Sequence, residues 1–111
     1  MIEKRPKNTS TGQRKEKGVV SWLEKKGWKI VYEGGRGPAD IIAANGSTKW
    51  FIQVKYTRSH GMDLSRFSKE LEPLIQMAEK NHGTAVLCIV IQRSIWFCSA
   101  KTFMTLKRGF L

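Results

Sequence analysis

Two periodicities of hydrophobic and polar residues follow one another along the chain, and they predict helices and strands. Apolar residues at helical spacing follow a Ser-x-x-Gln capping box that begins at Ser10, so we expect a first helix that stops at Gly27. A second helical stripe predicts a helix from about residues 70–72 to Asn81, because Pro73 is tolerated only near a helix start. The two stripes consist of Val19, Val20 and Leu23, and of Leu71, Leu74, Ile75 and Ala78.

Five further segments have the apolar or alternating patterns that are typical of β-strands. The second and third of these strands are expected to form a hairpin around Asn45-Gly46, since both residues tolerate the positive φ of a type I′ turn. The end of the chain, residues 101–111, is basic and apolar and is expected to form a short helix or a tail. The five expected strands are residues 28–32, 39–44, 47–57, 84–92 and 95–100.

The composition limits the chain to one small domain with a basic surface. Its 111 residues, 41% of them hydrophobic, are enough for a single core over residues 12–111, and the basic residues 1–11 lack periodicity and are expected to form a flexible arm. Lys and Arg number 20 against 9 Asp and Glu, and the net charge of +11 is typical of proteins that neutralise phosphate groups. A ribosomal or membrane-surface protein has a similar balance, so charge alone leaves the partner open.

The sequence disfavours membrane insertion, secretion and cysteine chemistry. No apolar run approaches the roughly 18 residues that cross a bilayer, and residues 1–7 lack the apolar core of a signal peptide. We therefore expect a cytoplasmic, nucleoid-associated protein with no membrane partner. Cys88 and Cys98 lie in apolar segments without metal-ligand spacing, so they are expected to be reduced core thiols.

The hairpin around Asn45-Gly46 is expected to bring polar residues from two strands together. With a two-residue loop, Asp40 lies opposite Phe51, so that Gln53 is its diagonal neighbour on the same face of the sheet. Lys55 follows on that face. Diagonal residues lie roughly 7–8 Å apart, which lets a carboxylate and an amide oxygen bind one divalent cation. An amphipathic hairpin edged with polar residues would show the same pattern without a metal.

A glutamate in the first helix is expected to face the same region. Glu16 lies three, four and seven residues before the apolar residues of its helix, so its carboxylate belongs to the inward-facing stripe. It is either a third acid of the metal site or a first-turn acid that complements the helix dipole. Glu33, after the first strand, is either a further acid of the site or a solvated loop residue.

Asp40, followed by a short hairpin and Gln53-Val54-Lys55, resembles the active-site motif of the PD-(D/E)XK nuclease superfamily. Over a wider range, from about Gly12 to Phe97, the chain resembles the archaeal Holliday junction resolvases. The shared features include Glu16 eleven residues before Gly27-Trp28 and a Gly-Gly loop before the aspartate. The resemblance implies an α/β fold of the restriction-endonuclease type, with a central mixed sheet of about five strands flanked by helices.

The same resemblance implies a Mg²⁺-dependent endonuclease, with Mn²⁺ able to substitute, that resolves four-way DNA junctions by paired nicks in recombination and repair. Asp40, the Gln53 side chain and the Val54 carbonyl would bind the metal. Glu16 would bind it directly or through water, and Lys55 would position the attacking water and stabilise charge on the phosphate. Glu16, Asp40, Gln53 and Lys55 are thus the implied catalytic residues. Two symmetric nicks need two sites related by a two-fold axis, which implies a homodimer.

Several residues around this site are expected to bind nucleic acid. Arg36, in the glycine-rich loop before Asp40, takes the place of a serine in the resembling resolvases and would contact a phosphate. His60 is interpreted more simply as a surface histidine than as a general base. The full set is Arg14, Lys15, Gly35, Arg36, Tyr56, Arg58, His60 and Arg66.

Large apolar residues are concentrated late in the chain and exceed what one small monomer core readily buries. We therefore expect the dimer interface to involve residues 95–111, although a monomer with a fuller core is the alternative. The residues behind this prediction are Ile95, Trp96, Phe97, Phe103 and Phe110.

Position 53 departs from the family pattern, because the resembling nucleases usually have a carboxylate there. Gln53 keeps an oxygen ligand but removes one negative charge, which weakens attraction for a divalent cation. Two alternatives to a working resolvase therefore stay open. One is a structure-specific DNA-binding dimer with weak or no cleavage, and the other is a nuclease of the same fold that acts on another DNA or RNA substrate.

Overall fold

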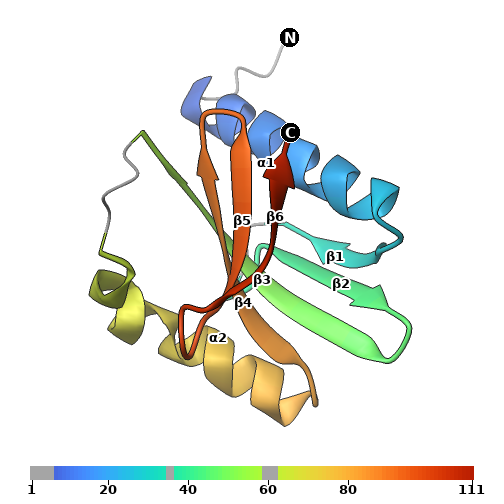
Figure 1. Ribbon diagram of the computed structural model, residues 1–111, viewed down its shortest axis with the longest axis vertical. Helices are drawn as coiled ribbons and strands as arrows, with labels where there is room; N and C mark the ends of the chain where they lie inside the picture. The colour runs from blue at the N-terminus through green and yellow to red at the C-terminus, as the bar shows by residue number, and fades with distance from the viewer. Residues whose placement is uncertain (1–6, 35–36, 59–62) are drawn as a thin grey trace, which may run out of the picture.

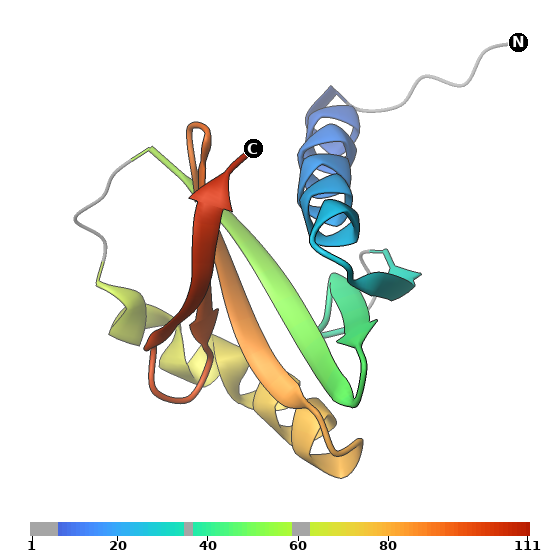
Figure 2. The same cartoon turned by 45° about the vertical axis from the view of Figure 1, so that its right-hand side comes forward.

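The computed structural model describes residues 7–34, 37–58 and 63–111, with the backbone alone for residues 7–15. A six-stranded sheet lies between two helices, α1 (Lys7–Lys25) and α2 (Ser68–Lys80), which cover its opposite faces (Figures 1 and 2). A short 3₁₀ helix, η1 (Leu64–Phe67), directly precedes α2. The strands are β1 (Lys29–Glu33), β2 (Ile41–Asn45), β3 (Thr48–Thr57), β4 (Thr84–Ile91), β5 (Ser94–Ser99) and β6 (Thr105–Phe110).

The strands are arranged in the sheet in the same order as in the sequence. All neighbouring strands are antiparallel except β3 and β4, which pair in parallel at the centre of the sheet. A parallel pair needs a crossover connection, and η1 with α2 supplies it. This mixed α/β architecture confirms the expected fold class, with one strand more than the sequence predicted.

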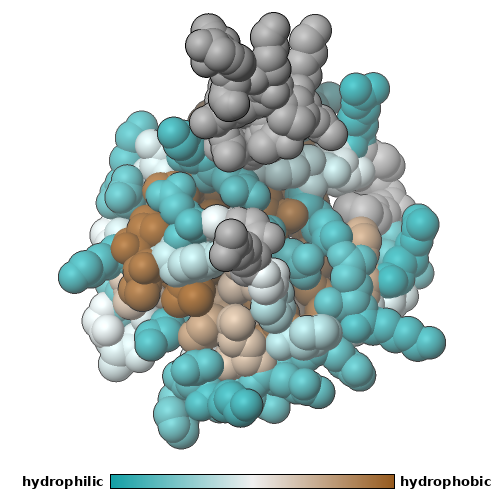
Figure 3. All heavy atoms as spheres, turned by 180° about the vertical axis from the view of Figure 1, so that it is seen from behind, coloured by the Kyte–Doolittle hydropathy of each residue, from teal (hydrophilic) through white to brown (hydrophobic). Residues whose placement is uncertain are grey.

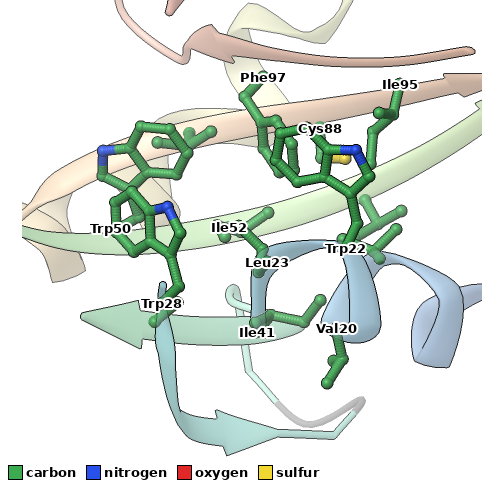
Figure 4. Close-up of a cluster of buried hydrophobic side chains, with 14 of the residues drawn as sticks. Val20, Trp22, Leu23, Trp28, Ile41, Trp50, Ile52, Cys88, Ile95 and Phe97 are labelled. Atoms are coloured by element: carbon green, nitrogen blue, oxygen red, sulfur yellow. The ribbon is translucent and has the colours of Figure 1, made fainter. Parts of the chain in front are cut away.

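The core has one layer on each side of the sheet. Under α1, Trp28 and Trp50 stack with ring centroids 4.3 Å apart, and Phe97 packs 5.4 Å from Trp50 (Figure 4). Under α2, the fully buried Leu71 and Leu74 pack in a second apolar cluster with residues of β3 and β4. Each helix is therefore held by the apolar stripe that its periodicity predicted.

The C-terminal segment is a strand, where the sequence predicted a short helix or a tail. Strand β6 pairs antiparallel with β5, and Phe103, with a φ of +62°, lies in the turn between them. Pairing with β6 satisfies backbone groups that β5 would otherwise present as an open sheet edge. The exposed residues of this region include Met104, Leu106, Phe110 and Leu111.

The two helices also begin earlier than the sequence predicted. Helix α1 starts at Lys7, so the capping-box residue Ser10 lies inside the helix and not at its start. Helix α2 runs without a break from Ser68 through Pro73, because η1 leads directly into it. Of the expected flexible arm, residues 7–11 are helical and residues 1–6 lie outside the described part of the chain.

Both cysteines are buried free thiols, as the sequence predicted. Burial raises the pKa of Cys88 well above its usual range and also raises the pKa of Cys98.

No helix in the described part of the chain is both long and apolar enough to cross a membrane. Hydrophilic side chains cover much of the back of the molecule, around an apolar patch (Figure 3).

Candidate functional site

The β2–β3 hairpin determines where the polar residues of the site lie, and its register differs from the sequence prediction. Asn45 pairs with Thr48, so the two-residue loop is Gly46-Ser47 and starts one residue later than expected. Gly46 has a φ of +63° at the first loop position, where a type II′ turn requires glycine. The predicted pairing of Asp40 with Phe51 is therefore wrong.

The corrected register brings Asp40 closer to Gln53. The last pair of the ladder is Ile41 with Ile52, so Asp40 stands next to Gln53 at the point where β2 begins. The shift is by two residues along β3, which leaves the predicted face of the sheet unchanged. Asp40 and Gln53 are thus nearest neighbours across the strands and not diagonal ones.

The carboxylate of Asp40 is attached to the backbone of β3. The Val54 N–H donates a 2.9 Å hydrogen bond to Asp40 Oδ2, and the Asp40 N–H donates a 2.8 Å bond to the Ile52 carbonyl. Because β2 starts only at Ile41, no residue of β2 pairs with Val54. The Asp40 carboxylate takes over the role of the missing backbone acceptor for the Val54 N–H. The carboxylate therefore lies beside the residue that separates Gln53 from Lys55.

Glu16, on α1, lies within electrostatic range of Asp40. Burial first, then the negative charges of Asp40 and Glu33, raise the pKa of the Glu16 carboxyl. Since α1 begins at Lys7, Glu16 is in the middle of the helix and the first turn contains no acidic residue, so the dipole interpretation is wrong. Glu16 thus interacts electrostatically with carboxyl groups of β1 and of the start of β2.

Burial and two neighbouring groups shift the pKa of Asp40 in opposite directions. Burial raises the pKa of its carboxyl, whereas the bond from the Val54 N–H and the positive charge of Lys55 lower it, so that the pKa remains above its usual value. A divalent cation would relieve the repulsion between Asp40 and Glu16, because an opposite charge close by favours the ionised form.

Lys55 points to the α2 side of the sheet and is held there by two residues of the crossover. Its Nζ makes an ion pair with the carboxylate of Glu70 and lies 5.1 Å from the centre of the Phe67 ring. Gln53 is half-buried on the same strand, two residues before it. The sequence pattern did not single out Glu70, because nothing but the folded crossover brings it to Lys55.

The donor atoms of this site suit a hard divalent cation. Asp40 offers a carboxylate oxygen, Gln53 an amide oxygen and Val54 a backbone carbonyl, and Mg²⁺ and Mn²⁺ prefer oxygen ligands. Within the described ranges, no three His, Cys, Asp or Glu side chains come together closely enough to bind a metal ion by themselves. A metal here would therefore use the amide, the carbonyl and water in addition to the acids.

The expected nucleic-acid contacts fall partly within the described residues. Tyr56 is half-buried, and burial together with the charges of Glu16, Cys88 and Asp40 raises the pKa of its hydroxyl. Arg58 and Arg66 are exposed, at the end of β3 and in η1. Gly35, Arg36 and His60 lie outside the described residues, as do the side chains of Arg14 and Lys15.

A family model and a solved structure agree on one family. The family model described as archaeal Holliday junction resolvase (Hjc) matches residues 7–110. The crystal structure of Hjc from Archaeoglobus fulgidus, described as a Holliday junction resolvase, superposes with a TM-score of 0.71 at 26% identity, over 90% of this chain and 81% of that chain.

Two curated relatives match over shorter ranges. A UPF0102 protein of Syntrophus aciditrophicus is 37% identical over 62 residues, which is 53% of this chain and 49% of the relative. A UPF0102 protein of Sphingopyxis alaskensis is 38% identical over 58 residues, which is 49% of this chain and 50% of the relative. The matches span about half the length of these relatives. Because the family model covers almost the whole sequence, the chain belongs to the archaeal Holliday junction resolvase family.

Proposed function

We propose that this protein is a metal-dependent endodeoxyribonuclease that resolves four-way DNA junctions by paired nicks. The observation that carries the proposal is the position of the Asp40 carboxylate, bound to the Val54 N–H between Gln53 and Lys55. Glu16 lies within electrostatic reach of it. Carboxylates that can bind a divalent cation, next to a lysine that can stabilise the reacting phosphate, are suited to metal-assisted phosphodiester hydrolysis.

Each residue of the site has a defined task in this reaction. Asp40, the Gln53 amide and the Val54 carbonyl would hold Mg²⁺, or Mn²⁺ in its place, with Glu16 binding directly or through water. The metal supplies a Lewis acid for the phosphate. Lys55 orients the attacking water and stabilises the negative charge that develops on the phosphate oxygens.

The proposed substrate and assembly follow from charge, family and surface. A net charge of +11 favours binding to the phosphate backbone of DNA. We place the protein in the cytoplasm, in association with the nucleoid. Branched DNA is the substrate class that the family name implies. Two opposed nicks require a homodimer, and the exposed Leu106 and Phe110 of β6 are suited to its interface.

One observation favours a second candidate function. Gln53 lacks the negative charge that family members usually carry at this position, so the metal site has one charge fewer with which to attract its cation. A structure-specific DNA-binding dimer that cleaves weakly or not at all would have the same fold and the same basic charge. The two functions differ only in turnover.

One experiment distinguishes these functions. The protein is incubated with a four-way junction, a linear duplex and a structured RNA, each with Mg²⁺, with Mn²⁺ and with a chelator. We expect metal-dependent nicks in two opposed strands of the junction and little cutting of the other substrates. Lys55→Ala serves as the control that should bind without cutting. Tight junction binding without cutting in either metal would favour the second candidate, and preferential cutting of RNA or linear duplex would overturn the junction assignment.

A further inference from the structure

Lys55 has no carboxylate partner on its own strand. Gln53, two residues before it on the same face of β3, is an amide and cannot form an ion pair. Asp40 accepts the Val54 N–H and interacts with Lys55 as a nearby charge, whereas the ion pair of Lys55 is with Glu70. A lysine ammonium on a flexible four-carbon chain needs a fixed partner if it is to remain in one position.

Glu70 supplies that partner from a different element. It lies in the first turn of α2, its carboxylate pairs with Lys55 Nζ, and the two side chains are 45% and 27% exposed. The next residue, Leu71, is fully buried, which fixes the register of the helix on the sheet and hence the position of Glu70. The ring of Phe67 approaches the same ammonium from the residue before the helix.

We propose that Glu70 is a positioning residue of the active site and replaces, from α2, the carboxylate that is missing at position 53. It holds the Lys55 ammonium in place, a task that no side chain of β3 can perform because that strand contains no carboxylate. Gln53 is then left to act as a neutral ligand. This inference rests on the proposed nuclease function for its effect on rate, but the pairing itself does not.

The ordinary alternative is that Glu70 only complements the dipole of α2, as acids in a first turn do. That role predicts a small change in stability and no effect on Lys55. Helix α2 contains a matched control for it, because Glu79 pairs with Lys101 at the other end of the same helix, away from the site. Glu79→Gln removes the same charge and the same kind of ion pair as Glu70→Gln.

The first test measures the pairing without any turnover. Reductive methylation of each lysine is followed by peptide mass spectrometry in wild type, Glu70→Gln, Glu79→Gln and the double variant Gln53→Glu/Glu70→Gln. We expect Glu70→Gln to speed the reaction of Lys55 by about twofold or more and to leave Lys101 unchanged, with the converse for Glu79→Gln. The double variant should restore slow reaction at Lys55. An unchanged rate at Lys55 in Glu70→Gln would overturn the pairing.

The second test measures junction cleavage by the same four proteins. We expect Glu70→Gln to lower kcat by about tenfold with little change in junction affinity, because a displaced lysine no longer stabilises the reacting phosphate. Glu79→Gln should cut like wild type, and Gln53→Glu should rescue Glu70→Gln. Wild-type kcat in Glu70→Gln, or a double variant as slow as Glu70→Gln, would overturn the positioning role. If the wild type cuts nothing, the nuclease function fails, and the methylation rates alone then support or overturn the pairing.

Discussion

At the scale of single residues, one carboxylate organises the candidate site. Asp40 stands where β2 has just begun, and its Oδ2 accepts the backbone N–H of Val54. A buried N–H without a partner costs about 1–3 kcal/mol, so this bond supports the hairpin as well as the site. The structural and the chemical role of Asp40 are therefore separable by substitution.

Asp40→Asn should keep the fold and lose the activity. The asparagine oxygen still accepts the Val54 N–H, but the negative charge that attracts the metal is gone. We expect metal binding and cleavage to be abolished, and stability within about 0.5 kcal/mol of wild type. Asp40→Ala, the comparison variant, should also lose about 1–3 kcal/mol in urea unfolding. Equal metal affinity of Asp40→Asn and wild type in isothermal titration would mean that Asp40 is not a ligand.

Gln53→Glu should strengthen metal binding, because charge count tunes the affinity of oxygen-ligand sites. The corrected register places position 53 directly beside Asp40, so a carboxylate there adds to the same cation site with almost no change in volume. We expect cleavage at a lower Mg²⁺ concentration, and a smaller advantage of Mn²⁺ over Mg²⁺. Titration of both metals into both proteins measures this effect. Identical affinities would show that position 53 does not face the metal.

At the scale of elements, the sequence predicted what depends on local periodicity. The apolar stripes identified α1 and α2, and apolar or alternating runs identified β1 to β5. The hairpin register was wrong by one loop residue, because Asn45-Gly46 favours a type I′ turn but Gly46 also suits the first position of a type II′ turn. Strand β6 was missed because Lys107 and Arg108 interrupt its alternation, and only pairing with β5 makes it a strand.

The Lys55–Glu70 ion pair was not predicted either, because it joins two elements that are distant in the sequence. Glu70 is fifteen residues from Lys55, and the pair forms because α2 crosses back over the sheet to connect β3 with β4. No local pattern carries that information. By contrast, the shared face of Gln53 and Lys55 follows from the two-residue period of a strand, so it was predictable even with the wrong register.

Gly83, in the connection between α2 and β4, lies in close contact with residues of β3. A Cβ on Gly83 would lie 2.5 Å from Cε1 of the buried Phe51 and 2.9 Å from the Lys49 carbonyl oxygen. Gly83→Ala should therefore destabilise the protein by about 1–3 kcal/mol in urea unfolding. Gly18→Ala in α1 is the matched control, because its nearest neighbour is 4.0 Å away and helix propensity favours alanine. Equal stability of the two variants would contradict the packing at Gly83.

At the scale of the whole molecule, exposed apolar residues have a different distribution from the one that the sequence suggested. Ile95 and Phe97 are fully buried in the monomer and cannot contribute to an interface, and the half-buried Trp96 and Phe103 can contribute only part of their surface. Phe110 remains 76% exposed and Leu106 44% exposed, both on the edge strand β6. Apolar residues on a sheet edge invite pairing with another chain. The proposed dimer interface thus narrows to β6 and the residues beside it.

This narrower interface leads to a prediction about assembly and cleavage together. Leu106→Ser/Phe110→Ser should convert a dimer to a monomer in light scattering at micromolar concentration, because it removes the exposed apolar area of β6. Val31→Ser is the matched control, since Val31 is 56% exposed on β1, the opposite edge of the sheet, and should leave the dimer intact. The monomeric variant should keep its active-site residues but make single nicks in a junction instead of paired ones. A monomer brings one active site to the junction, so the second nick requires a second, independent binding event. A monomeric wild type, or a serine double variant that remains dimeric, would show that β6 does not form the interface.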